Sequence, residues 1–131
     1  MNFLQPYPNW EEFYKEAFPL WKIYLENLKP LKIERIALRY INRIEIPLPL
    51  NSFQEYIVNM PPIPKSLPQL YSGFFMQIEV PCQKEGFTAL ITQTIETPNK
   101  SNVPFILDID VFKIINNNDF NFEDFNYIRE I

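Results

Sequence analysis

The sequence predicts an α+β fold, in which a kinked N-terminal helix packs against a mostly antiparallel sheet of about four strands. A Pro-rich crossover follows the first strand. Apolar residues recur at helical spacing before position 30, and four later segments alternate between apolar and polar residues. A Pro-rich passage separates the first of these segments from the other three. At 131 residues, the chain is expected to form one domain over 1–131.

The predicted helix begins after Asn9, whose side chain can accept a hydrogen bond from a backbone N–H of the first turn. Its apolar side is made of Trp10, Phe13, Tyr14, Ala17, Trp21, Tyr24, Leu25 and Leu28. Pro19 lies inside this pattern and lacks an N–H, so we expect a kink or two helices end to end. Pro30 ends the helix.

The segment 31–46 has the longest two-residue period in the chain and predicts the first strand. One side carries Ile36, Leu38, Tyr40, Asn42, Ile44 and Ile46. The other side carries Arg35, Ala37, Arg39, Ile41, Arg43 and Glu45. The strand therefore has an apolar face and a face with three arginines. Asn42 is expected to hydrogen-bond to a loop or a helix end, because a buried amide without a partner is costly.

The passage 47–70 is rich in proline, which lacks the N–H that a sheet interior needs, and so lies outside the sheet. Ser52 and Glu55 form a capping-box pattern for a short helix that Pro61 ends. The apolar face of this helix is Phe53, Tyr56, Ile57 and Met60. We favour a rigid crossover connection for this passage, with a binding loop as the alternative.

Three more segments alternate, at 73–82, 87–97 and 104–115, as in an antiparallel sheet with one covered face. The connections 83–86 and 98–102 are short enough for hairpins. If the strands follow one another as a meander, the arginines share a surface with polar residues of all three later strands, among them Glu79, Glu96, Asp108 and Asp110. The segment 116–131 predicts a turn and the beginning of a helix.

Three features of the composition exclude classes of catalytic site. The chain has no histidine, which excludes His-dependent nucleophilic catalysis, His acid–base catalysis and His metal ligation. Its single cysteine, Cys82, excludes an intrachain disulfide and a Cys-cluster metal site. Two glycines are too few for a P-loop or a dinucleotide-binding motif. The chain lacks the pattern of a signal peptide and an apolar run long enough for a membrane span, so a cytoplasmic location is expected.

The arginine face has two interpretations. The net charge of −4 makes nucleic acid an improbable partner, but the segment 29–43 is basic and the segment 108–131 is acidic. We favour a row of structural salt bridges between them. The alternative is a groove for an anionic small ligand, with the candidate binding residues Arg35, Arg39, Arg43, Tyr40 and Asn42. In that alternative, Asp108 and Asp110 would hold Mg²⁺, whereas the favoured interpretation needs no cofactor.

The run Arg35-Ile-Ala-Leu-Arg-Tyr-Ile-Asn-Arg-Ile44 resembles the signature of a sporadically distributed, uncharacterised family of bacterial and archaeal proteins. In that family the signature strand follows a Trp-containing helix, as this run follows Trp21 and Pro30. The resemblance implies no activity, because the family has none to carry over. Family members are longer, so the resemblance implies that this chain corresponds to their later portion. It would be a piece of a longer protein or a subunit that association completes.

The function expected from these observations is that of a non-enzymatic binding or interaction module within a larger assembly. A protein partner or self-association is expected, without a membrane contact. The alternative is a phosphate- or nucleotide-handling enzyme with a groove lined by arginine and aspartate. The two differ in one observable property. The enzyme needs Arg39, Asp108 and Asp110 to converge on an accessible pocket, whereas the module has them paired with each other and an exposed edge or patch elsewhere.

Overall fold

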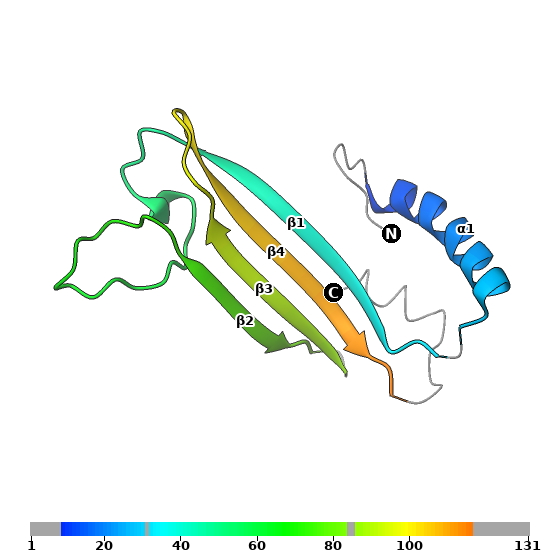
Figure 1. Cartoon of the computed structure of the whole chain (residues 1–131). Helices are drawn as coiled ribbons and strands as arrows, with labels where there is room; N and C mark the ends of the chain where they lie inside the picture. The colour runs from blue at the N-terminus through cyan, green and yellow to red at the C-terminus, as the bar shows by residue number, and fades with distance from the viewer. Residues whose placement is uncertain (1–8, 31, 84–85, 117–131) are drawn as a thin grey trace. The chain divides into compact units, whose positions relative to one another are not determined.

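The computed structural model describes residues 9–30, 32–83 and 86–116 (Figure 1). A helix is followed by a four-stranded antiparallel sheet, which confirms the predicted α+β class. The chain divides into two compact units, Met1–Ile33 and Glu34–Ile131, and each is described by itself. The single domain over 1–131 and the packing of the helix on the sheet stay predictions. The helix expected near the end of the chain lies outside the described residues.

Helix α1 spans Trp10–Leu28. Asn9 caps it as predicted, because its Oδ1 accepts a hydrogen bond from the N–H of Glu12 at 2.9 Å. The helix ends where Lys29 adopts a left-handed conformation. α1 runs unbroken through Pro19, so the alternative of two helices end to end is wrong. Among the described ranges, no helix combines the length and the hydropathy of a membrane span.

The sheet has the strand order β1-β4-β3-β2, and all neighbours are antiparallel. β1 spans Arg35–Pro47, β2 Phe75–Pro81, β3 Phe87–Ile95 and β4 Asn102–Ile114. β1 and β2 are the two outer strands (Figure 1). The strands do not follow one another as a four-strand meander, because β4 and not β2 lies beside β1. Short connections make β2, β3 and β4 pair in succession, whereas the long Pro-rich connection lets β1 pair on the far side of β4.

The hairpin between β3 and β4 is closed by a single asparagine side chain. Asn99 Oδ1 accepts hydrogen bonds from the N–H groups of Ser101 and Asn102, both at 2.8 Å. The Asn99 N–H in turn donates to the carbonyl of Asn102 at 2.9 Å. Asparagine favours such turns because its amide oxygen can reach backbone N–H groups a few residues ahead. This turn fixes the register between β3 and β4.

Ile36 and Phe87 are buried at one end of the sheet, and the main buried cluster of the sheet unit lies at the other end, where the Pro-rich connection packs on the apolar face. Its buried residues are Ile46, Ile57, Val103 and Phe105. Partly buried residues of the connection and the strands pack around them: Leu50, Phe53, Met60, Phe74, Ile95 and Leu107. The hydroxyl of Tyr71 donates to the carbonyl of Pro61 at 2.6 Å, which ties the end of the connection back to its middle. The passage 47–70 thus serves as the predicted crossover between the two edges of the sheet.

The helix predicted after Ser52 is reduced to one 3₁₀ turn, η1, at Phe53–Glu55. Ser52 Oγ accepts a hydrogen bond from the N–H of Gln54 at 3.2 Å, which closes this tight turn. The prediction of a longer helix is wrong, because the few residues before Pro61 cannot offset the cost of nucleating an α-helix. Ile57 and Met60 nevertheless reach the core from irregular chain.

Away from the core, part of the apolar face is exposed to solvent. Its exposed large side chains are Tyr40 and Ile44 on β1 and Ile78 and Val80 on β2. All four lie on the outer strands, whereas every residue of the inner strand β3 is buried or half-buried. On the apolar face, the large side chains that remain exposed therefore lie at the two edges of the sheet.

Candidate functional site

Two features of β1 are candidates for function: the face that carries its arginines and the backbone edge that points away from β4. The register places Arg39 opposite Asp110 and Ile41 opposite Asp108. Directly opposite residues share a face of the sheet. The arginines of β1 and the aspartates of β4 therefore lie on one surface, which we call the charged face. The sequence predicted this shared surface, although in a different strand order.

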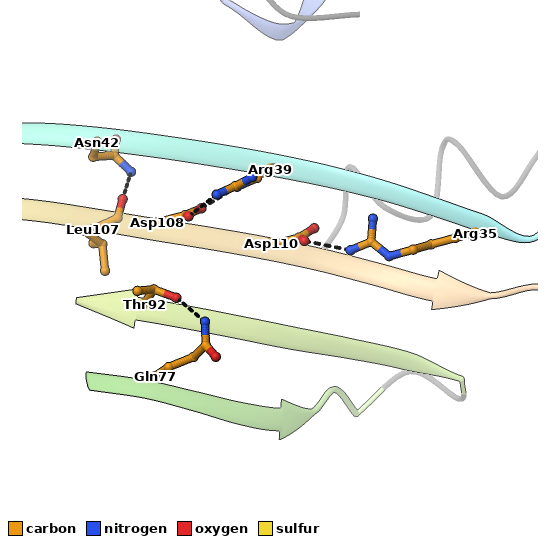
Figure 2. A network of polar contacts seen from close by, with 8 residues as sticks. All are labelled: Arg35, Arg39, Asn42, Gln77, Thr92, Leu107, Asp108 and Asp110. Carbon is orange, nitrogen blue, oxygen red and sulfur yellow. Dashed lines mark hydrogen bonds and ion pairs between the residues drawn. The ribbon is translucent and has the colours of Figure 1, made fainter. Parts of the chain in front are cut away.

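Arg39 holds Asp108 in a two-point contact between β1 and β4 (Figure 2). Arg39 Nε lies 2.8 Å from Asp108 Oδ1, and Nη2 lies 2.5 Å from Oδ2. Two parallel charge-assisted hydrogen bonds fix the guanidinium in place. The Arg39 side chain is 56% exposed and that of Asp108 is 15% exposed. Solvent therefore screens the pair, and we expect it to contribute about 0–1 kcal/mol to stability.

Arg35 and Arg43 are also bound to carboxylates. Arg35 extends along the sheet until its Nη2 lies 2.6 Å from Asp110 Oδ2, as Figure 2 shows. On the way its guanidinium lies over the ring of Phe112, with Cζ 4.4 Å from the centroid, so a cation–π contact supports it. Arg43 bonds to Glu96 of the β3–β4 turn, Nε to Oε2 at 3.2 Å, and to Glu45 on its own strand.

β2 takes no part in these contacts. Glu79 forms no ion pair with the three arginines, and Gln77 beside it donates to Thr92 Oγ1 of β3 at 2.9 Å (Figure 2). Glu79 is a carboxylate that could have met the arginines in a meander, and it does not do so because β4 and β3 lie between β1 and β2. The carboxylates that do bind them come from β4, from the turn before it and, for Arg43, also from Glu45 of β1 itself.

The pKa of Arg39 is raised further above its already high value. The hydrogen bond to Asp108 is the main cause; burial opposes it, and the charges of Asp108 and Asp110 add to it. A raised folded-state pKa gives a stabilising contribution that is complete below the unfolded-state pKa and is lost only as pH rises through the folded-state pKa. The charge of Arg39 therefore keeps its full contribution through neutral and moderately alkaline pH.

A double-mutant cycle measures the pair directly. Arg39→Ala, Asp108→Ala and the double variant are expected to give a coupling energy of about 0.5–1 kcal/mol, because the contact is two-pointed but exposed. Urea unfolding at low and at high salt is the measurement, and salt should reduce the coupling. A parallel cycle of Arg39 with Glu79, which lies beyond two intervening strands, should give none. Equal coupling in the two cycles would contradict the assignment.

Tyr40 and Asn42 lie on the opposite face from the arginines. Asn42 is exposed, and its Nδ2 donates to the carbonyl of Leu107 at 3.3 Å (Figure 2). The expected partner, a loop or a helix end, is wrong, because the register sets Asn42 directly opposite Leu107. The five candidate ligand residues therefore do not converge, since three of them lie on the charged face and two on the apolar face. Their role in ligand binding stays a prediction.

The two aspartates proposed as Mg²⁺ ligands each accept a hydrogen bond from an arginine. Asp110 Oδ1 is buried and accepts none from the described residues. In the same part of the chain, no group of three or more His, Cys, Asp or Glu side chains is placed to hold a metal ion. A metal would therefore have to compete with Arg39 and Arg35 for these carboxylates, and the Mg²⁺ alternative stays a prediction.

The backbone of β1 forms the second candidate site. At the two ends of the β1–β4 pair, the N–H of Ile115 donates to the carbonyl of Glu34 at 3.0 Å, and the N–H of Leu48 donates to that of Ser101 at 2.7 Å. Both bonds involve even-numbered residues on the β1 side. In an antiparallel pair, residues that exchange hydrogen bonds alternate with residues whose N–H and C=O point the other way. The odd-numbered residues of β1 therefore direct their backbone groups away from β4.

We call this row of backbone groups the outer edge. It consists of the N–H and C=O groups of Arg35, Ala37, Arg39, Ile41, Arg43 and Glu45. Among the described residues, β1 has β4 as its sole neighbour in the sheet, so no strand pairs with the outer edge. The side chains around it are open as well, since all but three of the thirteen residues of β1 are exposed.

The edge at β2 is less open to another strand. The N–H of Cys82 donates to the carbonyl of Phe87 at 2.9 Å, so the even-numbered residues of this strand face β3 and the odd-numbered ones face outward. β2 has seven residues, and its outward residues include Glu79 and Pro81. A short strand, a charged side chain and a proline without N–H all hinder the addition of a strand. β1 is therefore the edge at which pairing meets the least hindrance.

The charged face and the outer edge of β1 are connected. Charged side chains on an edge strand normally hinder the approach of another strand. Here the ion pairs direct Arg35 and Arg39 across the sheet toward β4, between the two ribbons in Figure 2, and direct Arg43 toward Glu96. The carboxylates thus hold the three cationic groups over the sheet, so that these arginine side chains do not cover the outer edge.

The sequence indicated the arginine side chains as a candidate site and an exposed edge or patch elsewhere, but it did not show which strand carries that edge. No residue type marks an outer strand, because the signal lies in the strand order. One indirect signal was present: the predicted strand 31–46 is followed by a long connection, which frees it from pairing with the next strand along the chain.

Comparison of the chain with protein-family models, with curated proteins and with solved structures found no match. The resemblance of the β1 run to the uncharacterised prokaryotic family stays a prediction.

Proposed function

We propose that this chain is a non-enzymatic interaction module, which binds an extended segment of a polypeptide partner along the outer edge of β1. The observation that carries the proposal is the length of that edge: β1 has thirteen residues, and every second one presents its backbone outward. A strand added there accepts and donates main-chain hydrogen bonds as an ordinary sheet neighbour does. The exposed side chains of Tyr40 and Ile44 supply apolar contacts beside it.

The charged face supports this function over anion chemistry. Each of the three arginines already binds a carboxylate, and Arg39 does so at two points. An anionic ligand would have to displace Asp108 from Arg39 and leave that carboxylate, which is 15% exposed, without its partner. Strand addition at the outer edge does not require these ion pairs to break. In a binding module they stabilise the sheet and keep the arginine side chains away from its edge.

Panning of random peptides displayed on phage tests the proposal, because this selection does not require the partner to be identified. The full chain is immobilised at low density, so that chains cannot pair with each other, and peptides are selected in moderate salt. We expect recovered peptides to lose binding to an Ile41→Pro variant, because that change removes an outward N–H but no bond to β4.

A Glu79→Pro variant is the matched control, since it removes an outward N–H from the other edge of the sheet. Peptides that bind β1 should bind this variant as well as the unchanged chain. Recovery of no peptides, or of peptides that bind Ile41→Pro and the unchanged chain equally, would contradict strand addition at β1.

A further inference from the structure

We infer that the outer edge of β1 takes a second copy of this chain, whose own β1 runs antiparallel to the first and joins the two sheets into one. The inference rests on the proposed function and names the partner. Strand pairing between identical edges is isologous, so a two-fold axis relates the copies and each outward group meets its counterpart. The sequence of β1 then decides whether such a pairing has a favourable register.

The outward residues of one copy must face the outward residues of the other, which means odd-numbered residues opposite odd-numbered residues. One residue of β1 therefore lies opposite the same residue of the second copy, and the two-fold axis passes between these two residues. Axes at Arg39 or Arg43 place an arginine opposite its own copy, and an axis at Ile41 places Arg39 opposite Arg43. Like charges directly opposite each other on a sheet are destabilising. These three registers are therefore disfavoured.

Axes at Leu38, Tyr40 and Asn42 avoid such pairs, and the length of paired edge separates them. An axis at Leu38 pairs a shorter stretch, because β1 begins at Arg35. An axis at Asn42 brings Pro47 opposite Ala37 and loses a hydrogen bond, since proline has no N–H. An axis at Tyr40 pairs the whole of the outer edge without proline. We therefore assign the axis to Tyr40.

This register also matches side chains on both faces of the joined sheet. On the charged face, Arg35 lies opposite Glu45 of the second copy at both ends of the paired edge, so the register sets opposite charges together there while Arg35 keeps Asp110 and Glu45 keeps Arg43 within each copy. On the apolar face, Ile44 lies opposite Ile36 of the second copy, which is only 5% exposed within its own chain, and Tyr40 meets its own counterpart. Ile44 and Tyr40 are among the exposed apolar side chains of the sheet unit, and both lose solvent exposure in the pair.

The arginine pairs are part of this arrangement. Arg39 and Arg43 lie near the axis, where their charges would otherwise approach those of the second copy. Both guanidinium groups are held inward by Asp108 and Glu96, so the backbones can meet. A foreign peptide would satisfy the same backbone groups, but it would not by itself supply the opposite charges and apolar residues at these positions.

Sedimentation velocity of the full chain over a range of concentrations tests the inference. The unchanged chain and Glu79→Pro are expected to show the same reversible monomer–dimer equilibrium. Ile41→Pro is expected to raise the dissociation constant of the dimer about tenfold or more, because proline lacks the N–H that residue 41 donates to the second copy. The two-fold symmetry removes this hydrogen bond near the axis from both copies.

Disulfide capture tests the register independently of that variant. In a Cys82→Ser background, Tyr40→Cys should form a covalent dimer under mild oxidation. Its Cα atoms would face each other in a non-hydrogen-bonded pair about 4.5 Å apart, within the range of a disulfide. Asn42→Cys is the control, since each copy of that residue is displaced four positions from its counterpart, roughly 13 Å along the strand.

The outcomes separate this inference from the proposed function. A chain that stays monomeric at all concentrations and gives no Tyr40→Cys disulfide overturns the second copy as partner, while peptide panning still decides strand addition. A dimer that Ile41→Pro leaves unchanged places the interface elsewhere and also overturns the inference. Capture through Asn42→Cys in preference to Tyr40→Cys overturns the assigned register.

Discussion

Replacing Ile46 with alanine is expected to lower the free energy of unfolding of the sheet unit by about 2–5 kcal/mol. Ile46 is 1% exposed and joins β1 to the core residues Val103 and Phe105 and to Ile57 of the connection. Removing its side chain leaves a cavity at the point where strand, connection and β4 meet. Urea unfolding followed by circular dichroism gives the change in free energy.

Ile44→Ala is the matched control for this prediction. Ile44 is the same residue type, on the same strand and the same face, two positions away, but it is 45% exposed. Its loss should cost about 1 kcal/mol or less when measured below the concentration at which chains pair. Similar costs at the two positions would contradict the placement of Ile46 inside the buried cluster and of Ile44 outside it.

Replacing Ile44 with proline is expected to cost about 3 kcal/mol, much more than the alanine change at the same position. The N–H of Ile44 points to β4, where the register places Phe105 opposite. Proline removes that hydrogen bond, leaves the carbonyl of Phe105 without a donor and restricts the backbone of a paired strand. Chemical unfolding and native-state hydrogen exchange of β4 both report the loss.

Ile41→Pro should cost about 1 kcal/mol or less, although Ile41 is also an exposed isoleucine of β1. Its N–H points away from β4, so no bond of the sheet is lost. The two variants differ in the direction of one backbone group, and the contrast between them tests the assigned outer edge. If both are equally destabilising, the alternation derived from the bonds of Glu34 and Leu48 is wrong.

The sequence was sufficient to predict the elements because their signals are local. Asn9 marked the start of α1, and the alternation around Arg39 marked β1 and its two faces. The prediction of a helix after Ser52 was wrong for a local reason as well. Capping signals cannot make an α-helix from so few residues before a proline. The strand order was not predictable in this way, because the length of a connection permits several pairings and does not choose one.

That one unknown, the strand order, explains most of the errors about the candidate site. The charged face was predicted from β1 and the Asp-x-Asp pattern of β4, and both do share a surface. The partners of individual arginines were not predicted, because Asp108 is adjacent to Arg39 only when β4 lies between β1 and β3. The outer edge followed from the same order, and it became visible once β1 was known to be the last strand of the sheet.

The alternation along β1 has a consequence for how this strand could change in evolution. Its outward backbone groups are chemically identical in every residue except proline, so in the proposed strand addition they would recognise the geometry of a partner and not its sequence. The side chains of the same residues lie on the charged face, where charge and shape would distinguish one partner from another. The proposed function thus assigns affinity and selectivity to different atoms of the same positions, so that substitutions of these side chains would change the choice of partner and leave the row of backbone groups in place.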